Sequence, residues 1–331
     1  MADRNPHLQA AGHWRSVTGR RSLKRTALAL LIVLASPRAF AAPVLGVIYP
    51  DIREPYRTIF TEILQGIRQS APGDVKTLQL GPDASTGRVS AWVAGNQVEA
   101  LIALGRNGFH LGEDMHRRVP VVFGAVLIPP DRDGGKITGI SLVPAPAALF
   151  ARLQELSPHT RRVFVVYDPG NNASLIALAR RAAARWNLRL IAVPAEDTRA
   201  AVREYRKILN TRAHAGDAIW LPQDSVTVND QVVLPMILEK AWENELVVFS
   251  SNPSYVQRGV LFSLYPDNQK MGQELARLAL ARARDPGKSS LAGMRPLTAL
   301  RVAVNTRTAD HLQLNLSRRE ISRFDLVFPS R

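Results

Sequence analysis

Short apolar runs along the chain alternate with segments in which apolar residues recur every three or four positions. Val44–Tyr49 and Ala100–Leu104 are continuous apolar runs typical of buried strands, and Val75–Leu80 is predicted as a further strand, whereas Tyr56–Gln69 places its apolar residues on one helical face. A strand followed by a helix at this spacing predicts a parallel sheet with helices packed on it. The same pattern predicts helices at Ser85–Asn96 and Leu111–Arg117 and strands at Pro120–Val126 and Ile137–Leu142.

The alternation begins again after a predicted helix at Pro144–Leu156, so the chain predicts a second sheet of the same kind. Each half is long enough for a core of its own, which favours an α/β protein of two lobes. The predicted strands of the second half are Val163–Tyr167, Leu188–Val193, Ala218–Leu221, Leu246–Phe249, Gly259–Leu264 and Leu300–Val304. The predicted helices are Ala173–Trp186, Thr198–Leu209, Gln231–Glu243 and Asn268–Arg284.

The first 41 residues have the order of an export signal. Several basic residues precede the apolar run Ala27–Ala35, and Ala39-Phe40-Ala41 supplies small residues for a signal peptidase. A membrane anchor is the alternative, but the run is about half of the ~20 apolar residues that a bilayer requires. We therefore expect residues 1–41 to be a cleaved signal peptide and the mature chain to begin at Ala42. The chain has no cysteine, which excludes a lipid-modified cysteine after the signal and makes the periplasm the expected location.

Composition excludes several classes of function. The formal net charge is +15, but the basic residues are spaced as solvated helix faces and aromatic residues are sparse, so no nucleic-acid partner is expected. No Gly-x-Ser-x-Gly turn, phosphate-binding glycine loop or pair of histidines at metal-ligand spacing is present. The sequence predicts a protein that is not an enzyme, with no metal and no cofactor.

Six segments, taken in order, give the chain a family resemblance. They are Gly139-Ile140-Ser141, Leu156-Ser157-Pro158, Tyr167 to Ser174, Ile219 to Asp224, Gly259 to Ser263 and Val304 to Ala309. In this order the chain resembles the substrate-binding proteins of ABC transporters that have the type I periplasmic binding fold.

The resemblance implies two lobes, each a parallel sheet flanked by helices, with a ligand cleft between them. The crossovers between lobes are expected at about Leu142, Pro253 and Arg295. The N-terminal lobe is then expected to hold 42–142 plus 260–292, and the C-terminal lobe 143–259 plus 293–331.

The resemblance also implies that the ligand is held by residues at the carboxyl ends of the strands. The residues expected there are Tyr49, Asp51, Arg106, Asn107, Val126, Asp168, Asn171, Asn172, Asp224, Ser250, Ser251 and Tyr265.

Two of these residues carry the charges expected at the site, and each has a plainer alternative. Asp224 either holds a cationic group of a ligand or caps the following segment. Arg106 either pairs with a carboxylate or phosphonate or is a solvated surface residue. Asp168, Asn171 and Asn172 also have the chemistry of a turn and helix cap. Ile128 stands where relatives often have a polar turn residue, which puts a standard amino-acid ligand in doubt.

The expected function is capture of a small molecule, an amino acid or other carboxylate, by a monomer in the periplasm. The expected partner is an ABC permease, which would receive the ligand after the lobes close. A sensing module that signals to a receptor or histidine kinase uses the same closure and stays an alternative. A hydrolase on the same fold is a third, for which the sequence offers no catalytic group.

Overall fold

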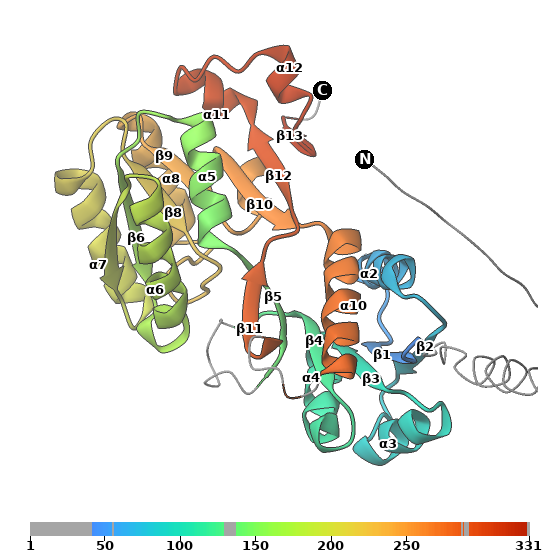
Figure 1. The fold of residues 1–331 in the computed structure, drawn as a ribbon. Helices are drawn as coiled ribbons and strands as arrows, with labels where there is room; N and C mark the ends of the chain where they lie inside the picture. The colour runs from blue at the N-terminus through green and yellow to red at the C-terminus, as the bar shows by residue number, and fades with distance from the viewer. Residues whose placement is uncertain (1–41, 55, 129–136, 286, 288–290, 330–331) are drawn as a thin grey trace, which may run out of the picture. The chain divides into compact units, whose positions relative to one another are not determined.

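The computed structural model describes residues 42–329 except for 55, 129–136, 286 and 288–290. The expected signal peptide, residues 1–41, lies outside the described residues. The order of strands and helices follows the predicted alternation, and the strands form two sheets (Figure 1). The fold class is therefore α/β, as predicted.

The first sheet has six strands in the order β11-β5-β4-β3-β1-β2, and every pair in it is parallel. Its strands are β1 (Leu45–Pro50), β2 (Val75–Leu80), β3 (Ala100–Leu104), β4 (Val121–Val126), β5 (Gly139–Pro144) and β11 (Met294–Leu297). Its helices are α2 (Tyr56–Ser70), α3 (Thr86–Gly95), α4 (Gly105–Glu113) with a 3₁₀ turn at Asp114–Arg117, and α10 (Asn268–Arg284).

The second sheet has seven strands in the order β13-β12-β10-β9-β8-β6-β7, parallel except that β12 runs antiparallel to β10. Its strands are β6 (Arg162–Tyr167), β7 (Arg189–Pro194), β8 (Ala218–Leu221), β9 (Val247–Ser250), β10 (Phe262–Pro266), β12 (Leu300–Asn305) and β13 (Leu326–Phe328). Its helices are α5 (Pro146–Leu156), α6 (Pro169–Arg185), α7 (Thr198–Lys207) with a π turn at Ile208–Arg212, α8 (Val233–Glu243), α9 (Ser254–Gln257), α11 (Thr306–His311) and α12 (Arg318–Ile321).

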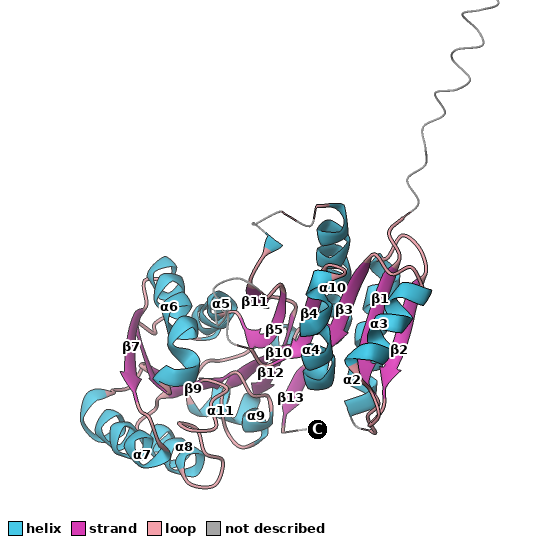
Figure 2. Ribbon diagram, turned by 90° about the horizontal axis from the view of Figure 1, so that it is seen from below, coloured by secondary structure: helices cyan, strands magenta, loops and turns pink. Residues whose placement is uncertain are grey.

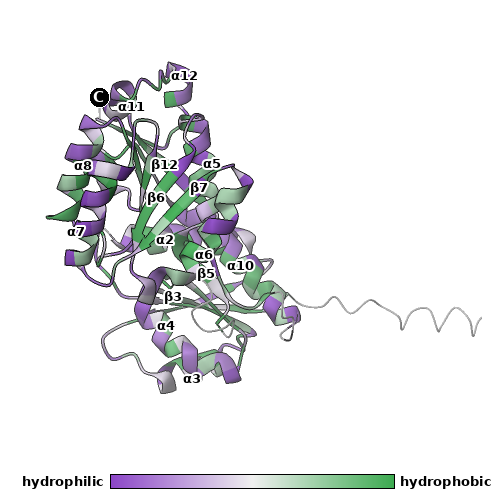
Figure 3. Ribbon diagram, turned by 90° about the vertical axis from the view of Figure 1, so that its left-hand side faces the viewer, coloured by the Kyte–Doolittle hydropathy of each residue, from purple (hydrophilic) through white to green (hydrophobic). Residues whose placement is uncertain are grey.

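Each sheet is covered by helices on both faces, as its continuous apolar strands require. In the first sheet, α2 and α10 pack on one face and α3 and α4 on the other. In the second, α5 and α6 lie on one face and α7 and α8 on the other (Figures 1 and 2). The strands β6 and β12 are mostly hydrophobic, whereas the helices around them alternate hydrophobic and hydrophilic segments (Figure 3).

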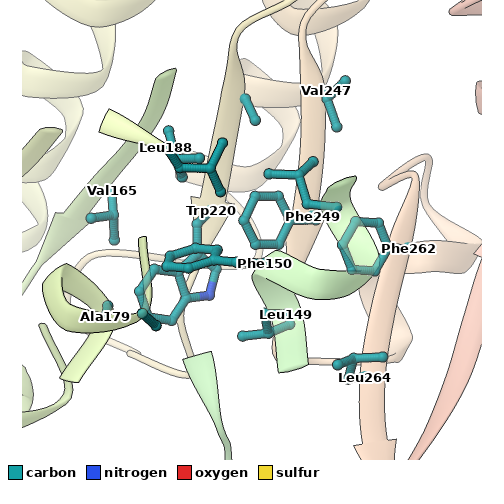
Figure 4. Close-up of a cluster of buried hydrophobic side chains, with 14 of the residues drawn as sticks. Leu149, Phe150, Val165, Ala179, Leu188, Trp220, Val247, Phe249, Phe262 and Leu264 are labelled. Atoms are coloured by element: carbon teal, nitrogen blue, oxygen red, sulfur yellow. The ribbon is translucent and has the colours of Figure 1, made fainter. Parts of the chain in front are cut away.

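An aromatic cluster forms the centre of the second core. The ring of Phe150 on α5 meets Trp220 of β8 edge to face at 5.9 Å, and Phe249 of β9 stacks on Phe262 of β10 at 5.2 Å (Figure 4). All four side chains are fully buried. Because offset and edge-to-face contacts add to the free energy of burial, this cluster fixes α5 firmly across three strands.

Two short segments belong to other sheets than the sequence indicates. The strand β10 was expected in the N-terminal lobe, within 260–292, but it pairs with β9 and β12 of the second sheet. The strand β11 was expected in the C-terminal lobe, within 293–331, but it pairs with β5 of the first sheet. The chain therefore passes between sheets near Ala145, Asp267 and Thr298, and the crossover expected at Pro253 is instead a return within the second sheet through α9. Neither strand could be assigned from its own residues, because strand pairing depends on distant partners.

Candidate functional site

Three neighbouring strands of the first sheet end at the same edge with residues expected at the site. These are β4, β3 and β1, which are parallel and adjacent. After β1, the exposed carboxylate of Asp51 accepts a hydrogen bond from the Gln79 side chain at 2.8 Å, and its amide donates to the Leu80 carbonyl. Tyr49 is half-buried against the core of this lobe. These contacts join the ends of β1 and β2, so Asp51 has a structural contact as well as an exposed oxygen.

Arg106 and Asn107 lie in the first turn of α4 and not in the loop that the sequence indicates. Gly105 has a φ of +71°, a conformation that favours glycine, and it turns the chain from the fully buried β3 directly into the helix. Leu104, the residue before the helix, supplies no side-chain cap. Within the part of the chain that the structure describes, Arg106 and Asn107 are exposed and make no hydrogen bond or ion pair. A guanidinium and an amide are thus available beside uncapped helix N–H groups.

The end of β4 has a strained backbone. Ala125 has a φ of +55°, which is uncommon for a residue with a Cβ, and the register between β4 and β5 shifts between Phe123 and Val126. Val126, expected at the site, is buried, and so is Ile128, whereas the side chain of Leu127 is 53% exposed. Strain of this kind gathers at functional sites. Leu127 belongs to the same loop as Val126 and is a further candidate for the site, whereas the left-handed conformation of Ala125 has no signal in the sequence.

Asp224 is the centre of a buried hydrogen-bond network in the second sheet. Its Oδ2 accepts from the amide of Asp168 at 2.8 Å and from the Asn172 side chain at 3.0 Å. Its Oδ1 accepts from the amides of Val226 and Thr227 at 2.9 and 3.2 Å. A carboxylate has about four acceptor positions, and all of them are used here. These bonds are those of the capping alternative, and a ligand cation at Asp224 would have to displace an existing donor.

Asp168, Asn171 and Asn172 belong to the same hydrogen-bond network as Asp224. Asp168 is the N-cap of α6, accepting from the Gly170 amide at 2.9 Å, and its other oxygen accepts from the exposed Asn171 side chain. Asn172 is buried and donates to Asp224. The structure thus brings four predicted residues together, as a structural junction between the ends of β6 and β8.

Ser250 is the last residue of β9 and Ser251 follows it, and both side chains are buried and hydrogen-bonded within the protein. Ser250 Oγ donates to the Leu221 carbonyl at 3.1 Å, and Ser251 Oγ accepts from the Trp220 indole at 3.3 Å. Tyr265, at the end of β10, is half-buried, and burial followed by the charge of Asp325 raises the pKa of its phenol. These residues shape the edge of the sheet but offer few free polar groups.

Two tyrosines behind this edge carry perturbed hydroxyls that the sequence did not single out. Burial and a hydrogen bond to Asp230 raise the pKa of Tyr255 to about 12. Tyr205 of α7 is fully buried, and its hydroxyl has no hydrogen-bond partner among the described residues. Burial is the main cause that raises the pKa of this hydroxyl, and the charge of Asp224 is the second. Both groups are thus held neutral at physiological pH, and they add no charge to the site.

The described residues include no group of three or more His, Cys, Asp or Glu side chains that could hold a metal ion. Among the described residues expected at the strand ends, the side chains of Arg106 and Asn107 have no hydrogen-bond partner, and Leu127 is exposed after the adjacent strand β4. Such an arrangement can bind an organic anion through charge and an apolar surface.

Comparison with known proteins identifies the family. The model of the ABC transporter substrate binding protein family matches residues 99–310, which is more than half of the chain. The chain belongs to this family. The resemblance inferred from the sequence is therefore confirmed.

The fold of this substrate binding protein matches that of a solved structure. The ligand-free, open structure of a substrate binding protein with adhesive properties from Clostridium difficile has a TM-score of 0.62 at 12% identity, over 87% of this chain and 100% of that one. A domain from Streptococcus pneumoniae in complex with L-Trp has a TM-score of 0.49 at 14% identity, over 86% of this chain and 100% of that one. No curated protein matches the sequence.

The family sets the general function of the chain, which is to bind a substrate of an ABC transporter. Among the described residues, none of the helices has both the length and the apolar character needed to cross a bilayer.

Proposed function

We propose that the protein is exported to the periplasm, binds a small organic carboxylate and delivers it to an ABC permease. Membership of the family supports the transport role and favours a permease over a receptor or kinase as the partner. The basic and apolar order of residues 1–41 supports export. The single observation that carries the ligand class is the free guanidinium of Arg106.

Arg106 is suited to an anion for three reasons that do not depend on one another. It is exposed directly after a fully buried strand, it has no partner among the described residues, and the helix that it begins has no side-chain cap. A guanidinium binds a carboxylate through two parallel hydrogen bonds, and the positive end of the helix adds to the attraction. Ala125 has a strained backbone near the end of β4, the strand next to β3, and Leu127 is exposed just after it. These two residues favour a ligand with an apolar part beside the carboxylate.

The first test is a thermal-shift screen of the mature protein, together with mass spectrometry of any small molecule that co-purifies. Branched and aromatic amino acids form the first panel, and short carboxylates and purines the second. A ligand at 100 times its dissociation constant stabilises the folded state by ~2.7 kcal/mol, so the correct compound should raise Tm by several degrees. A panel without any shift, and a protein that carries no small molecule, would contradict capture of a solute.

The role of Arg106 is tested with one substitution and a matched control. Arg106→Ala should raise the Kd of a carboxylate ligand by about 10- to 100-fold, since a charge-assisted hydrogen-bond pair contributes about 1.5–3 kcal/mol. Tm without ligand should stay the same, because Arg106 makes no contact in the described structure. Arg181→Ala, which removes an exposed arginine in the middle of α6, should change neither value. Equal affinity of the Arg106→Ala variant and the unmodified protein would remove this residue from the site.

Delivery is tested with purified components. Addition of the liganded protein to its permease in proteoliposomes should stimulate ATP hydrolysis, and Arg106→Ala should require more ligand for the same stimulation. Stimulation of a histidine kinase, with none of any permease, would favour the sensing alternative.

A further inference from the structure

A pocket lies beside the C-terminal half of α8, and none of the residues of the candidate site lines it. Its volume is about 530 Å³, and its walls come from α8, the residues after α9, the end of β12 with α11, and the end of β13. These elements lie together around one end of the second sheet (Figure 1). Ligand pockets commonly have volumes of about 300–1,000 Å³, so this one is large enough for a small organic molecule.

The direction of β12 separates this pocket from the carboxyl-end loops. Because β12 is antiparallel to β10, its last residue, Asn305, lies beside Leu261, just before β10 begins. The residues of the second sheet that were expected at the site lie instead at the carboxyl ends of β6, β8 and β9. None of the residues expected to bind the substrate lines this pocket.

Hydrogen bonds hold the floor of the pocket in place. The Asn305 side chain donates to the Val256 carbonyl at 2.8 Å and accepts from the Thr308 amide at 3.0 Å. The Thr308 hydroxyl donates to the Gly259 carbonyl at 3.0 Å. These hydrogen bonds occupy the side chains of Asn305 and Thr308 within the protein. A ligand would therefore be recognised by the other residues that line the pocket.

One wall presents a fixed indole. Trp242 is 40% exposed, and its ring stacks on His311 with centroids 3.5 Å apart and planes 6° from parallel. The ring nitrogen Nε2 of His311 lies 2.9 Å from the Trp242 carbonyl oxygen, and the Arg307 guanidinium lies 5.9 Å from the indole centroid. An aromatic ring that is already held in position loses little freedom when it binds another planar group.

The charges of the walls favour an anion. Two guanidiniums, of Arg258 and Arg307, line the pocket, against the one carboxylate of Glu239. Arg258 donates to the backbone carbonyl of Asp230 at 2.9 Å, and Arg307 lies over the indole. Neither guanidinium pairs with a carboxylate among the described residues, so both keep donors for a ligand.

We propose that this pocket binds a small planar aromatic carboxylate, with its ring against Trp242 and its carboxylate against Arg258 and Arg307. This second site is independent of the proposed transport ligand, because the two share no residue. Glu239 stands at the same pocket and selects against a ligand with a second negative charge on that side.

The test is isothermal titration calorimetry of the mature protein with benzoate and indole-3-acetate as probes, beside benzamide, which lacks the charge, and cyclohexanecarboxylate, which lacks the planar ring. We expect the two aromatic acids to bind and each control compound to bind at least about tenfold more weakly. Arg307→Ala and Trp242→Leu should each raise the Kd of the acids by about tenfold or more, while Arg106→Ala should leave it unchanged.

Two further variants keep the result interpretable. Arg258→Ala tests the second guanidinium without touching the indole, and Arg307→Lys keeps the positive charge and should recover part of the affinity. The thermal transition of each variant shows whether it is folded. Absence of binding at millimolar acid, equal Kd in the Arg307→Ala variant, or a loss of binding with Arg106→Ala alone would each overturn the proposal, the last because the acid would then occupy the strand-end site.

Discussion

Asp224 accepts four hydrogen bonds in the interior of the second lobe, and its replacement should therefore destabilise the protein. Asp224→Ala leaves three backbone amides and the Asn172 side chain without an acceptor where water has little access. Each buried donor left unpaired costs about 1–3 kcal/mol, so we expect the free energy of unfolding in urea to fall by about 3 kcal/mol.

Asp51→Ala is the matched control, because it removes an exposed carboxylate with one side-chain partner. It should change stability by no more than about 0.5 kcal/mol. Equal stability of the Asp224→Ala variant and the unmodified protein, together with weaker ligand binding, would return Asp224 to the ligand site.

At the residue scale, the sequence located polar groups at strand ends but not which of them are free. The turn chemistry of Asp168 and the position of Asp224 were visible, but their shared hydrogen bonds span more than 50 residues of chain. Whether a carboxylate is free or occupied depends on how two distant loops meet, which no local pattern records. The strain at Ala125 was hidden for a similar reason, because it follows from the bulge beside β5.

Among the elements, α2 and α10 pack with their backbones almost in contact. A Cβ at Gly66 would lie 1.9 Å from the Gln269 carbonyl oxygen, and one at Gly272 would lie 2.1 Å from that of Ile63. Gln69 reinforces this contact by accepting hydrogen bonds from the Gln269 and Gln273 side chains at 2.9 and 3.0 Å. The two glycines thus set the distance between the helices.

Gly272→Ala should lower the stability of the protein, although alanine in place of glycine usually stabilises a helix. Alanine is favoured over glycine by about 1 kcal/mol in a helix, but relief of this overlap would force the helices apart at a cost of about 1–3 kcal/mol or more. We expect a net loss of about 2 kcal/mol in the free energy of unfolding by urea. Gly87→Ala in α3, where no atom lies within 4 Å of the new Cβ, should be neutral or slightly stabilising. A stabilised Gly272→Ala variant would show that the helices are not in this contact.

Asp267, the N-cap of α10, predicts a pH dependence. Burial opposes its charge, but hydrogen bonds from Lys270 and the charge of Arg301 prevail and hold the pKa of its carboxyl below the ordinary value of 3.8. At a pH between the folded pKa and the ordinary pKa, the unfolded chain binds more protons at this carboxyl than the folded chain does. The free energy of unfolding therefore rises with pH in this range. The contribution is complete above the ordinary value and is lost as the pH falls through the lower, folded value.

Asp267→Asn keeps a capping oxygen but removes the charge. The difference in unfolding free energy between the unmodified protein and this variant should be of order 1 kcal/mol at neutral pH and should disappear in acid. Urea unfolding at a series of pH values measures it. A difference that does not change down to the most acid pH would assign the effect to packing alone.

The sequence predicted most elements at this scale because their apolar periods are long and regular. The strand β3 and the helix α10 have the predicted bounds, and most of the others differ by a few residues. The helix α4 begins six residues earlier than predicted, because only the φ of +71° at Gly105 lets the chain turn without a loop. The strand β11 was missed because Arg295 and Pro296 interrupt its apolar residues, and β13 was missed because three residues are too few for a period to be recognised.

For the whole molecule, we expect the exported protein to begin at Ala42 and to be monomeric. The first strand begins at Leu45, so cleavage there leaves the whole sheet intact. Intact-mass analysis of periplasmic protein measures the start, and light scattering measures the oligomeric state. Recovery of the uncleaved chain from the membrane fraction would contradict the export signal.

The late position of α10 in the chain has a consequence for biosynthesis. Five strands of the first sheet are complete by Pro144, but one of its faces is covered in part by α10, which begins at Asn268. During synthesis and translocation, the nascent first half therefore waits with apolar surface uncovered while more than 100 further residues are made. The protein should depend on holding chaperones during this interval, and a gene truncated after the first half should yield an aggregating product instead of a small stable domain.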